Sequence, residues 1–360
     1  MSIDFADVLT EVIARRASDL HVAAGAQPTV RVRGRLTALE SFPKLSTQDT
    51  REIVYSIISG EQRRRLENDL QLDFAYVIPG QARFRVNAYF QRAALGAAFR
   101  LIPTELTSID ALGLPPVVHE LTKKPRGIVL VTGPTGSGKS TSLAAMIDEI
   151  NSTREEHIMT IEDPIEFLHA HKKCIVNQRE LGNDATSFAA ALKAALRQDP
   201  DVILVGEMRD LETISTALTA AETGHLVFAT LHTQDAAQTI DRIIDVFPAH
   251  QQGQVRVQLS VALQGIMTQQ LLPTADGSGR VVATEVLVPN PAIRNLIREG
   301  KTHQIYSVLQ TSSAAGMQTM DTSLAMLVRQ RKITQKLAEA RSSTPDELRR
   351  LLGSATLAAA

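Results

Sequence analysis

The stretch Val129-Leu-Val-Thr-Gly-Pro-Thr-Gly-Ser-Gly-Lys-Ser-Thr141 decides the fold of this chain. It contains the phosphate-binding loop pattern Gly-x4-Gly-Lys-Ser at residues 133–140. Residues 127–132 form a short apolar run rich in β-branched side chains, which is typical of a buried parallel strand. Apolar residues follow at helical spacing from 140 to 150. A strand, a glycine-rich loop and a helix in this order predict an α/β domain that binds a nucleotide.

The residue types in this loop suit a chain of phosphates. Glycines let backbone amides approach phosphate oxygens closely, and the N-terminus of the following helix adds positive partial charge. Lys139 is expected to reach the β- and γ-phosphates, and the hydroxyl group of Ser140 is expected to bind Mg²⁺. The predicted nucleotide-binding residues form one continuous run: Gly133, Pro134, Thr135, Gly136, Ser137, Gly138, Lys139, Ser140 and Thr141.

Length, composition and charge narrow the class of protein. A chain of 360 residues is long enough for two domains. Its formal net charge of -1 and its 4% of aromatic residues disfavour a nucleic-acid partner. No apolar run approaches the ~20 residues that cross a bilayer, and the acidic N-terminus lacks the pattern of a signal peptide. The single cysteine, Cys174, excludes an internal disulfide and a multi-cysteine zinc site, so we expect a cytoplasmic protein without zinc.

Residues 1–102 are expected to form a small α+β domain. Its expected elements are a helix at 5–17, a hairpin around Gly34, a helix at 48–66 and strands at 83–90 and 94–102. Prolines punctuate residues 103–125, which are expected to be a linker with one short helix.

From residue 126 onward, strands and helices alternate, which is typical of a parallel sheet with crossover helices. The nucleotide-binding core is expected at 126–289, with strands at 127–132, 157–162, 174–177, 201–206 and 226–231 and a later pair at 280–288. Residues 290–353 are expected to be helical, beginning with Asn290 as an N-cap and a first helix that stops at Gly300. Residues 354–360 are expected to fray as a flexible tail.

Acidic residues follow two of the predicted strands. The apolar run 201–206 ends at Glu207, a carboxylate placed to hold Mg²⁺ through water or to polarise an attacking water. Glu162, Asp163 and Glu166 place three carboxylates within five residues, and a metal-bound nucleotide would relieve their mutual repulsion. We expect Ser140, Glu162 and Asp163 as metal ligands, partly through water or nucleotide. An ordinary acidic turn is the alternative interpretation of 162–166.

Two histidines stand at the ends of the strand predicted at 226–231. His225 and His232 are seven residues apart, roughly 23 Å along a strand, so they cannot ligate one metal ion. His232 lies at the nucleotide side and can form a hydrogen bond to a γ-phosphate. For His225, at the opposite end, a structural or intersubunit role is at least as plausible.

Taken together, these motifs resemble one family of ATPases. The loop at 133–141, the acidic box Glu162-Asp-Pro-Ile-Glu166, the strand ending in Gly206-Glu207 and the histidine box at 223–235 resemble the secretion ATPases of type II secretion and type IV pili. Further stretches are similar to the members of that family that retract pili: Ala17-Ser-Asp-Leu-His21, Ala292-Ile-Arg-Asn-Leu-Ile-Arg-Glu-Gly-Lys-Thr-His303 and Gly316-Met-Gln-Thr-Met-Asp321. The resemblance spans essentially the whole chain.

The resemblance implies a PAS-like domain at 1–102 and a RecA-like ATPase core at 126–289, in a homohexameric ring with nucleotide between subunits. ATP and Mg²⁺ would be the cofactors, and ATP hydrolysis would drive type IV pilus retraction and so twitching motility. The motor would work in the cytoplasm, associated peripherally with the inner membrane at the pilus base. Its partners would be the inner-membrane platform protein, other pilus machinery and related ATPases.

The same resemblance implies roles for individual residues. Glu207 would be the catalytic acid, Glu166 would help to position water, and His232 would face the γ-phosphate. Arginines of the first domain would complete a neighbouring subunit's site, with Arg85 and Arg100 as candidates and plain surface charge as the alternative. A short amphipathic helix would transmit the stroke through Ala292, Ile293, Arg294, Asn295, Leu296 and Ile297. Within it, Arg294, Asn295 and Arg298 are expected to lie away from the apolar stripe, within reach of a partner or the neighbouring subunit. The alternative is that the apolar face only packs on its own domain.

Other functions share parts of this pattern. A pilus assembly or type II secretion ATPase is the nearest alternative, although relatives of that type often carry a four-cysteine zinc element that one cysteine cannot build. A RecA-like nucleic-acid translocase would need a basic stripe with interleaved aromatic residues. A nucleotide-binding regulator that does not hydrolyse is disfavoured because both candidate water-activating positions, 166 and 207, hold glutamate.

Overall fold

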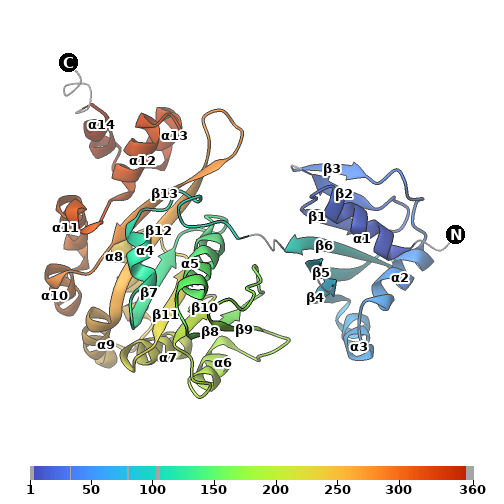
Figure 1. The fold of residues 1–360 in the computed structure, drawn as a ribbon, viewed down its shortest axis with the longest axis horizontal. Helices are drawn as coiled ribbons and strands as arrows, with labels where there is room; N and C mark the ends of the chain where they lie inside the picture. Colours follow the sequence, from blue (N-terminus) through green and yellow to red (C-terminus); the bar gives the residue numbers. More distant parts are fainter. Residues whose placement is uncertain (1–3, 33, 79–80, 103–105, 354–360) are drawn as a thin grey trace. The chain divides into compact units, whose positions relative to one another are not determined.

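The computed structural model describes residues 4–32, 34–78, 81–102 and 106–353. They form two compact units, and the division falls between Glu105 and Leu106 (Figure 1). Each unit has its own sheet and its own hydrophobic core, so each is described separately. No helix within the described ranges is long and apolar enough to cross a membrane.

The first unit is a six-stranded antiparallel sheet with helices packed on one face. Its strand order is β3-β2-β1-β6-β5-β4. The strands are β1 (Asp19–Val22), β2 (Thr29–Val32), β3 (Arg35–Ala38), β4 (Gln71–Ile78), β5 (Ala82–Gln91) and β6 (Ala94–Ile102), and the helices are α1 (Phe5–Ala14), α2 (Thr47–Ser56) and α3 (Gly60–Asp69). The predicted hairpin around Gly34 is confirmed by the pairing of β2 with β3.

Side chains alternate along β5 between the buried core and the exposed surface. Phe84, Val86 and Ala88 are fully buried in the core beneath α1 and α2, whereas Arg85 between them is exposed. This matches the period of two expected for a half-buried strand.

The single helix predicted at 48–66 is wrong, because two helices occupy this region. Ser59 begins the second helix with a capping box, in which its hydroxyl accepts from the Gln62 backbone N–H and its own N–H donates to the Gln62 side chain. Such a reciprocal cap satisfies two otherwise unpaired amides and favours a new helix start over continuation. The sequence pattern Ser-x-x-Gln carried this signal.

The second unit contains a seven-stranded sheet in the order β13-β12-β7-β11-β10-β8-β9. The strands are β7 (Gly127–Thr132), β8 (His157–Glu162), β9 (Ile175–Glu180), β10 (Val202–Val205), β11 (Leu226–Leu231), β12 (Leu263–Pro273) and β13 (Arg280–Leu287). All neighbours run parallel except β12 and β13, which are antiparallel. The α/β architecture with a mostly parallel sheet agrees with the sequence prediction, apart from β12.

Strand β12 was not predicted, although it occupies the sheet position next to β7. The pair expected at 280–288 is a single strand, β13, whose antiparallel partner is β12. Helix α9 (Ala249–Ala262) ends where β12 begins, with no turn residue between Ala262 and Leu263. Without a glycine or proline boundary, the periodicity gave no reason to start a strand there.

Helices cover both faces of this sheet, and alternate residues of β7 divide between them (Figure 1). Ile128 and Leu130 pack in one core with α6 (Phe188–Ala195), α7 (Leu211–Glu222), α8 (Ala236–Asp245) and α9. Val129 and Val131 pack in the other with α4 (Val117–Thr122) and α5 (Lys139–Thr153). This burial on both faces explains why β7 reads as a continuous apolar run.

The segment from Leu106 to residue 125, predicted as part of a linker, belongs to the second unit. Ile109, Leu114, Val118 and Leu121 are buried in the same core as α5.

The C-terminal region is helical, as predicted. It comprises α10 (Pro291–Glu299), α11 (Ile305–Thr311), α12 (Met320–Arg329), α13 (Gln335–Arg341) and α14 (Pro345–Gly353), with short 3-10 turns at Thr302–Gln304 and Ser313–Ala315. The Asn290 side chain accepts from the Ile293 N–H, and Gly300 ends α10 in the left-handed region at φ 68°, so both predicted caps of this helix are confirmed. The tail predicted at 354–360 lies outside the described residues.

Candidate nucleotide-binding site

The loop between β7 and α5 has a backbone that only glycine allows at its first position. Gly133 has φ 137°, and a Cβ there would lie 2.3 Å from the carbonyl oxygen of Gln269. Gly138 is the N-cap of α5 at φ 89° and carries no side chain over the first helical amides. Those amides and the helix dipole favour an anion at this position, so the residues present fit a phosphate group.

Lys139 supplies the positive charge of the loop. Its Nζ donates to the carbonyls of Gly133 at 2.8 Å and Pro134 at 3.1 Å, and lies 3.5 Å from Nδ1 of His232. Burial lowers the pKa of Lys139, while the charges of Glu207 and Glu166 oppose that shift. The ammonium group is therefore held at the loop, in the electrostatic field of the carboxylates that follow β10 and β8.

Strand β12, which the sequence did not predict, contacts the phosphate-binding loop and the end of β7 through two side chains. The Gln269 Nε2 donates to the carbonyl of Ser137 at 2.7 Å, and the hydroxyls of Thr268 and Thr132 are 2.8 Å apart. Both β12 side chains are buried, at 1% and 0% exposure. Polar residues at 268–270 between the apolar pairs Ile266-Met267 and Leu271-Leu272 were the available signal, because buried polar groups need partners.

Glu207 follows β10 and lies at the centre of a charged cluster. It contacts Arg209, with Nε to Oε1 at 2.5 Å and Nη2 to Oε2 at 2.6 Å, and Nε2 of His232 lies 2.9 Å from Oε1. Burial would raise the pKa of Glu207, but hydrogen bonds and positive charge from Arg209 and His232 hold it below its ordinary value. The carboxylate is thus ionised at neutral pH. Arg209 was not predicted, although its position two residues after Glu207 is visible in the sequence.

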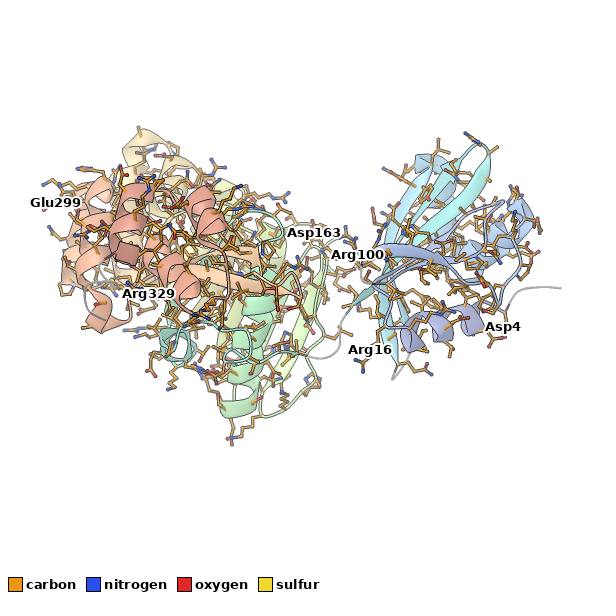
Figure 2. All side chains as sticks on the ribbon, turned by 90° about the horizontal axis from the view of Figure 1, so that it is seen from above. Asp4, Arg16, Arg100, Asp163, Glu299 and Arg329 are labelled. Atoms are coloured by element: carbon orange, nitrogen blue, oxygen red, sulfur yellow. The ribbon has the colours of Figure 1, made fainter. Side chains whose placement is uncertain are left out.

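The acidic box divides into one half-buried carboxylate and two exposed ones. Oε1 of Glu162 accepts from the Thr160 hydroxyl at 2.7 Å and from Gln178 Nε2 at 3.2 Å, and burial raises the pKa of this side chain. Asp163, labelled in Figure 2, and Glu166 are exposed.

These groups line one cleft of about 400 Å³. Of the predicted residues, those that line it are Thr135, Gly136, Gly138, Lys139, Ser140, Thr141, Glu162, Asp163, Glu166, Glu207 and His232. Phe188, Leu271 and Arg280 also line it and were not predicted, because they come from elements distant in sequence. Gly133, Pro134 and Ser137 form the body of the loop behind it.

The donors in the cleft suit Mg²⁺, which prefers hydroxyl and carboxylate oxygens. Ser140, Glu162 and Asp163 supply such atoms. Within the described ranges, no group of three or more His, Cys, Asp or Glu side chains is close enough to hold a metal ion alone. A Mg²⁺ ion here would therefore complete its coordination with phosphate oxygens or water.

Other predicted residues lie outside the cleft. Arg85 and Arg100 are register partners on β5 and β6 of the first unit, and both are exposed (Arg100 is labelled in Figure 2). Asp19 on β1 binds Nε of Arg100 at 3.0 Å and faces Nε of Arg31 at 3.8 Å. His225 is at the far end of β11 from His232, where its Nδ1 lies 2.9 Å from the carbonyl of Ala220. This is a structural contact.

Helix α10 corrects one prediction about Arg294. This side chain is half-buried, and its Nη1 donates to the carbonyls of Ser260 and, at 3.0 Å, of Val261 at the end of α9. A guanidinium group there satisfies carbonyls that the last helical turn leaves unpaired. Asn295 is exposed as expected, whereas Ala292, expected on the apolar stripe, is exposed too. The buried stripe consists of Ile293 and Ile297, with Leu296 partly buried.

Comparison with known proteins gives a consistent result along the chain. A family model described as "Type II/IV secretion system protein" matches residues 2–280. The type IV pilus retraction ATPase PilT of Pseudomonas aeruginosa is 50% identical over 344 residues, covering 96% of this chain and 99% of PilT. A twitching motility protein of Neisseria gonorrhoeae is 53% identical, covering 89% of this chain and 86% of that protein. The crystal structure of the pilus retraction motor PilT with bound ADP superimposes with a TM-score of 0.91 at 53% identity, covering 97% of this chain and 99% of that one.

Proposed function

This chain belongs to the type II/IV secretion system protein family, and we propose that it is an ATP-hydrolysing motor that retracts type IV pili and so drives twitching motility. The observation that carries the proposal is the similarity to PilT along nearly the full length of both chains, including the C-terminal helices. The first unit then corresponds to a PAS-like domain and the second to a RecA-like ATPase core.

ATP and Mg²⁺ are the proposed cofactors. The amides of residues 136–140 and the ammonium group of Lys139 would bind the phosphates, and Ser140 with Glu162 and Asp163 would hold the metal ion directly or through water. When bound, Mg²⁺ neutralises charge that develops on the phosphate oxygens. Arg280 and Phe188, which also line the cleft, help to enclose the nucleotide.

Glu207 is the proposed catalytic residue. Because its pKa lies below the ordinary value, its main contribution is to accept a hydrogen bond from the attacking water and orient it in line with the γ-phosphate. His232 contacts both Glu207 and Lys139, so it is placed to sense whether a γ-phosphate is present. Glu166, exposed at the cleft, helps to position water from the other side.

We propose that the motor acts from the cytoplasm, peripherally on the inner membrane at the pilus base. Its proposed partners are the platform protein, the pilus machinery and related ATPases. To test the function, pili should be followed in cells that lack this protein and in the same cells carrying it on a plasmid. We expect surface pili without retraction in the first and restored retraction in the second. Retraction that persists without the protein, while the purified enzyme hydrolyses ATP, would favour a secretion role.

The proposed active unit is a homohexameric ring whose subunits complete one another's sites. The supporting feature is the exposed arginine pair Arg85 and Arg100 in a unit without a phosphate loop of its own. An arginine supplied in trans can stabilise charge in the transition state of phosphoryl transfer.

Mixed rings should therefore be less active than dilution predicts. Lys139→Ala subunits mixed with wild-type subunits at equal amounts are expected to reduce ATPase activity to well below half, because each inactive subunit also disturbs its neighbour. Steady-state ATPase assays across mixing ratios measure this. A straight line between activity and the wild-type fraction would contradict shared sites.

The α10 residues Ala292–Ile297 are proposed to transmit motion without taking part in hydrolysis. Since Arg294 holds α9, the residues to change are Asn295 and Arg298, which are exposed and bound only within α10. The double variant Asn295→Ala/Arg298→Ala is expected to lower stability by under ~0.5 kcal/mol, keep most ATPase activity and lose retraction.

The matched control is Arg294→Ala in the same helix. It should cost about 1–2 kcal/mol of stability, because it leaves the α9 carbonyls without their charged donor. Thermal unfolding, ATPase assays and retraction assays on both variants separate the two roles. Normal retraction by the Asn295→Ala/Arg298→Ala variant would reduce α10 to a structural element.

A further inference from the structure

A buried carboxylate joins the nucleotide site to the C-terminal helices. Glu285 on β13 is 4% exposed, and its Oε1 accepts from the backbone N–H of Ala236 at 2.9 Å. The backbone N–H of Met320, which lines a cavity beside Glu285, also stabilises the ionised form of this carboxylate. Ala236 begins α8 and Met320 begins α12, so one side chain holds the N-termini of two helices that are far apart in sequence.

The α8 end of this junction leads directly to the catalytic cluster. Residues 232–235 connect His232 to the start of α8, and Asp235 is the N-cap of that helix. Hydrogen bonds hold this segment to the first turns of α8. The hydroxyls of Thr233 and Thr239 are 2.7 Å apart, and the Gln234 N–H donates to the Gln238 side chain at 2.8 Å. Any shift in the start of α8 is therefore transmitted to His232 and to its contact with Glu207.

The α12 end of this junction contains the stretch Gly316-Met-Gln-Thr-Met-Asp321, none of which lines the nucleotide cleft. Gln318 pairs with Val286 through both backbone groups, and its side chain donates to the Thr284 carbonyl at 2.9 Å. Asp321 is buried and accepts from the hydroxyls of Ser342, Thr344 and Tyr306. The stretch thus docks the C-terminal helices on β13 next to Glu285.

We propose that Glu285 is a positioning residue that couples the His232 loop to the C-terminal helices, and that its ionisation controls this coupling. A cavity of about 210 Å³ adjoins it, lined among others by Asp235, Tyr306 and Asp321, so the two helix ends have room to move relative to β13. An ionised carboxylate can accept from both amides, whereas a protonated one loses an acceptor and can hold only one of them well.

The groups around Glu285 bring its ionisation into the physiological pH range. Burial, together with the charges of Asp235 and Asp321, raises the pKa of Glu285 to about 7 against the opposing effect of the two backbone amides. The titratable groups that face Glu285 are Asp235 before α8, Tyr306 on α11 and Asp321 on α12.

A purely structural role does not account for a carboxylate here. A folded-state pKa above the ordinary 4.5 means that the folded protein holds the proton more tightly, so stability falls as pH rises from about 4.5 through about 7. A glutamine carries no charge to bury at pH 8, although, like the protonated carboxyl group, it can accept well from only one of the two amides. We therefore expect Glu285→Gln to raise the melting temperature relative to wild type at pH 8 but not at pH 5.

The decisive test compares the pH dependence of ATP hydrolysis in three proteins. Only about 10% of a group with pKa 7 is ionised at pH 6, so wild-type kcat should fall about tenfold between pH 8 and pH 6 with an inflection near 7. Glu285→Gln should lack this inflection, while any dependence due to His232 remains in both. Asp235→Asn keeps the N-cap but removes a facing charge, so its inflection should move to lower pH.

Hydrogen exchange provides a readout that does not need turnover. In Glu285→Gln, and in wild type at pH 6, protection corrected for intrinsic rates should fall about tenfold at the starts of α8 and α12 and stay unchanged in α5. Should Glu285→Gln fail to assemble, the wild-type titration and the Asp235→Asn shift still decide the matter. The same inflection in Glu285→Gln as in wild type, an unmoved inflection in Asp235→Asn, or unchanged exchange at both helix starts would overturn the proposal. The activity profile rests on the proposed ATPase function, but the exchange result does not, so the two can fail separately.

Discussion

Glu207→Gln is expected to bind ATP normally and hydrolyse it at least ~100-fold more slowly than wild type, as for loss of a catalytic acid–base group. The amide keeps the shape of the side chain and can still contact His232 and Arg209. It carries no charge, however, and a water oriented by an amide is less polarised than one oriented by a carboxylate. Binding of a fluorescent ATP analogue and steady-state hydrolysis measure the two properties separately.

The matched control is Glu212→Gln on α7, where the exposed carboxylate binds Lys193 on the protein surface. Exposed ion pairs contribute little, so this variant should hydrolyse ATP at the wild-type rate. A Glu207→Gln enzyme that turns over within a few-fold of wild type would remove Glu207 from the catalytic role. The water would then have to be oriented by Glu166.

Lys139→Ala is expected to reduce hydrolysis by roughly a hundredfold to a thousandfold, the scale seen when a preorganised donor to a developing negative charge is removed. The alanine leaves the loop backbone in place, because Gly133 and the β12 contact through Gln269 define its shape. It removes the only charge that reaches the loop carbonyls in the described structure. Nucleotide affinity should fall as well, which calorimetry can measure.

Lys172→Ala serves as the control for this substitution. Its ammonium group binds Asp148 at 2.6 Å on the same helix, α5, but far from the loop. Nearly unchanged affinity and turnover are expected, since the pair is exposed. If Lys139→Ala kept substantial hydrolysis while Lys172→Ala behaved as wild type, the loop would bind its anion through backbone amides alone.

The site residues that the sequence predicts are those whose structural requirement comes from residues nearby in the chain. Gly133 and Gly138 need a backbone that other residues rarely adopt, and Lys139 and Ser140 follow within the same turn. Glu207 is found because an apolar strand ends at a single carboxylate. In each case the structural requirement lies within a few residues of the chain.

The parts that escape prediction depend on contacts across the sheet or between helices. Gln269 supports the loop from a strand with no boundary signal, and Arg280 reaches the cleft from the next strand. Arg294 shows a second limit: a helical wheel places it off the apolar stripe, but its long side chain folds back onto carbonyls of α9. A wheel gives the direction of Cβ and not the reach of a charged end.

The position of β12 has a consequence for how the protein is made. Strand β7 precedes the loop, yet its neighbour on one side, β12, is encoded about 130 residues later, as the register of Val131 with Met267 shows. Pairing over such a sequence separation closes late, because a long loop must be ordered first. On the ribosome, the phosphate loop emerges with its edge unpaired and Ser137 without its Gln269 partner until the chain has grown past β12. The motif that identifies this protein is among the first parts of the second unit to be synthesised, and among the last to become competent to bind.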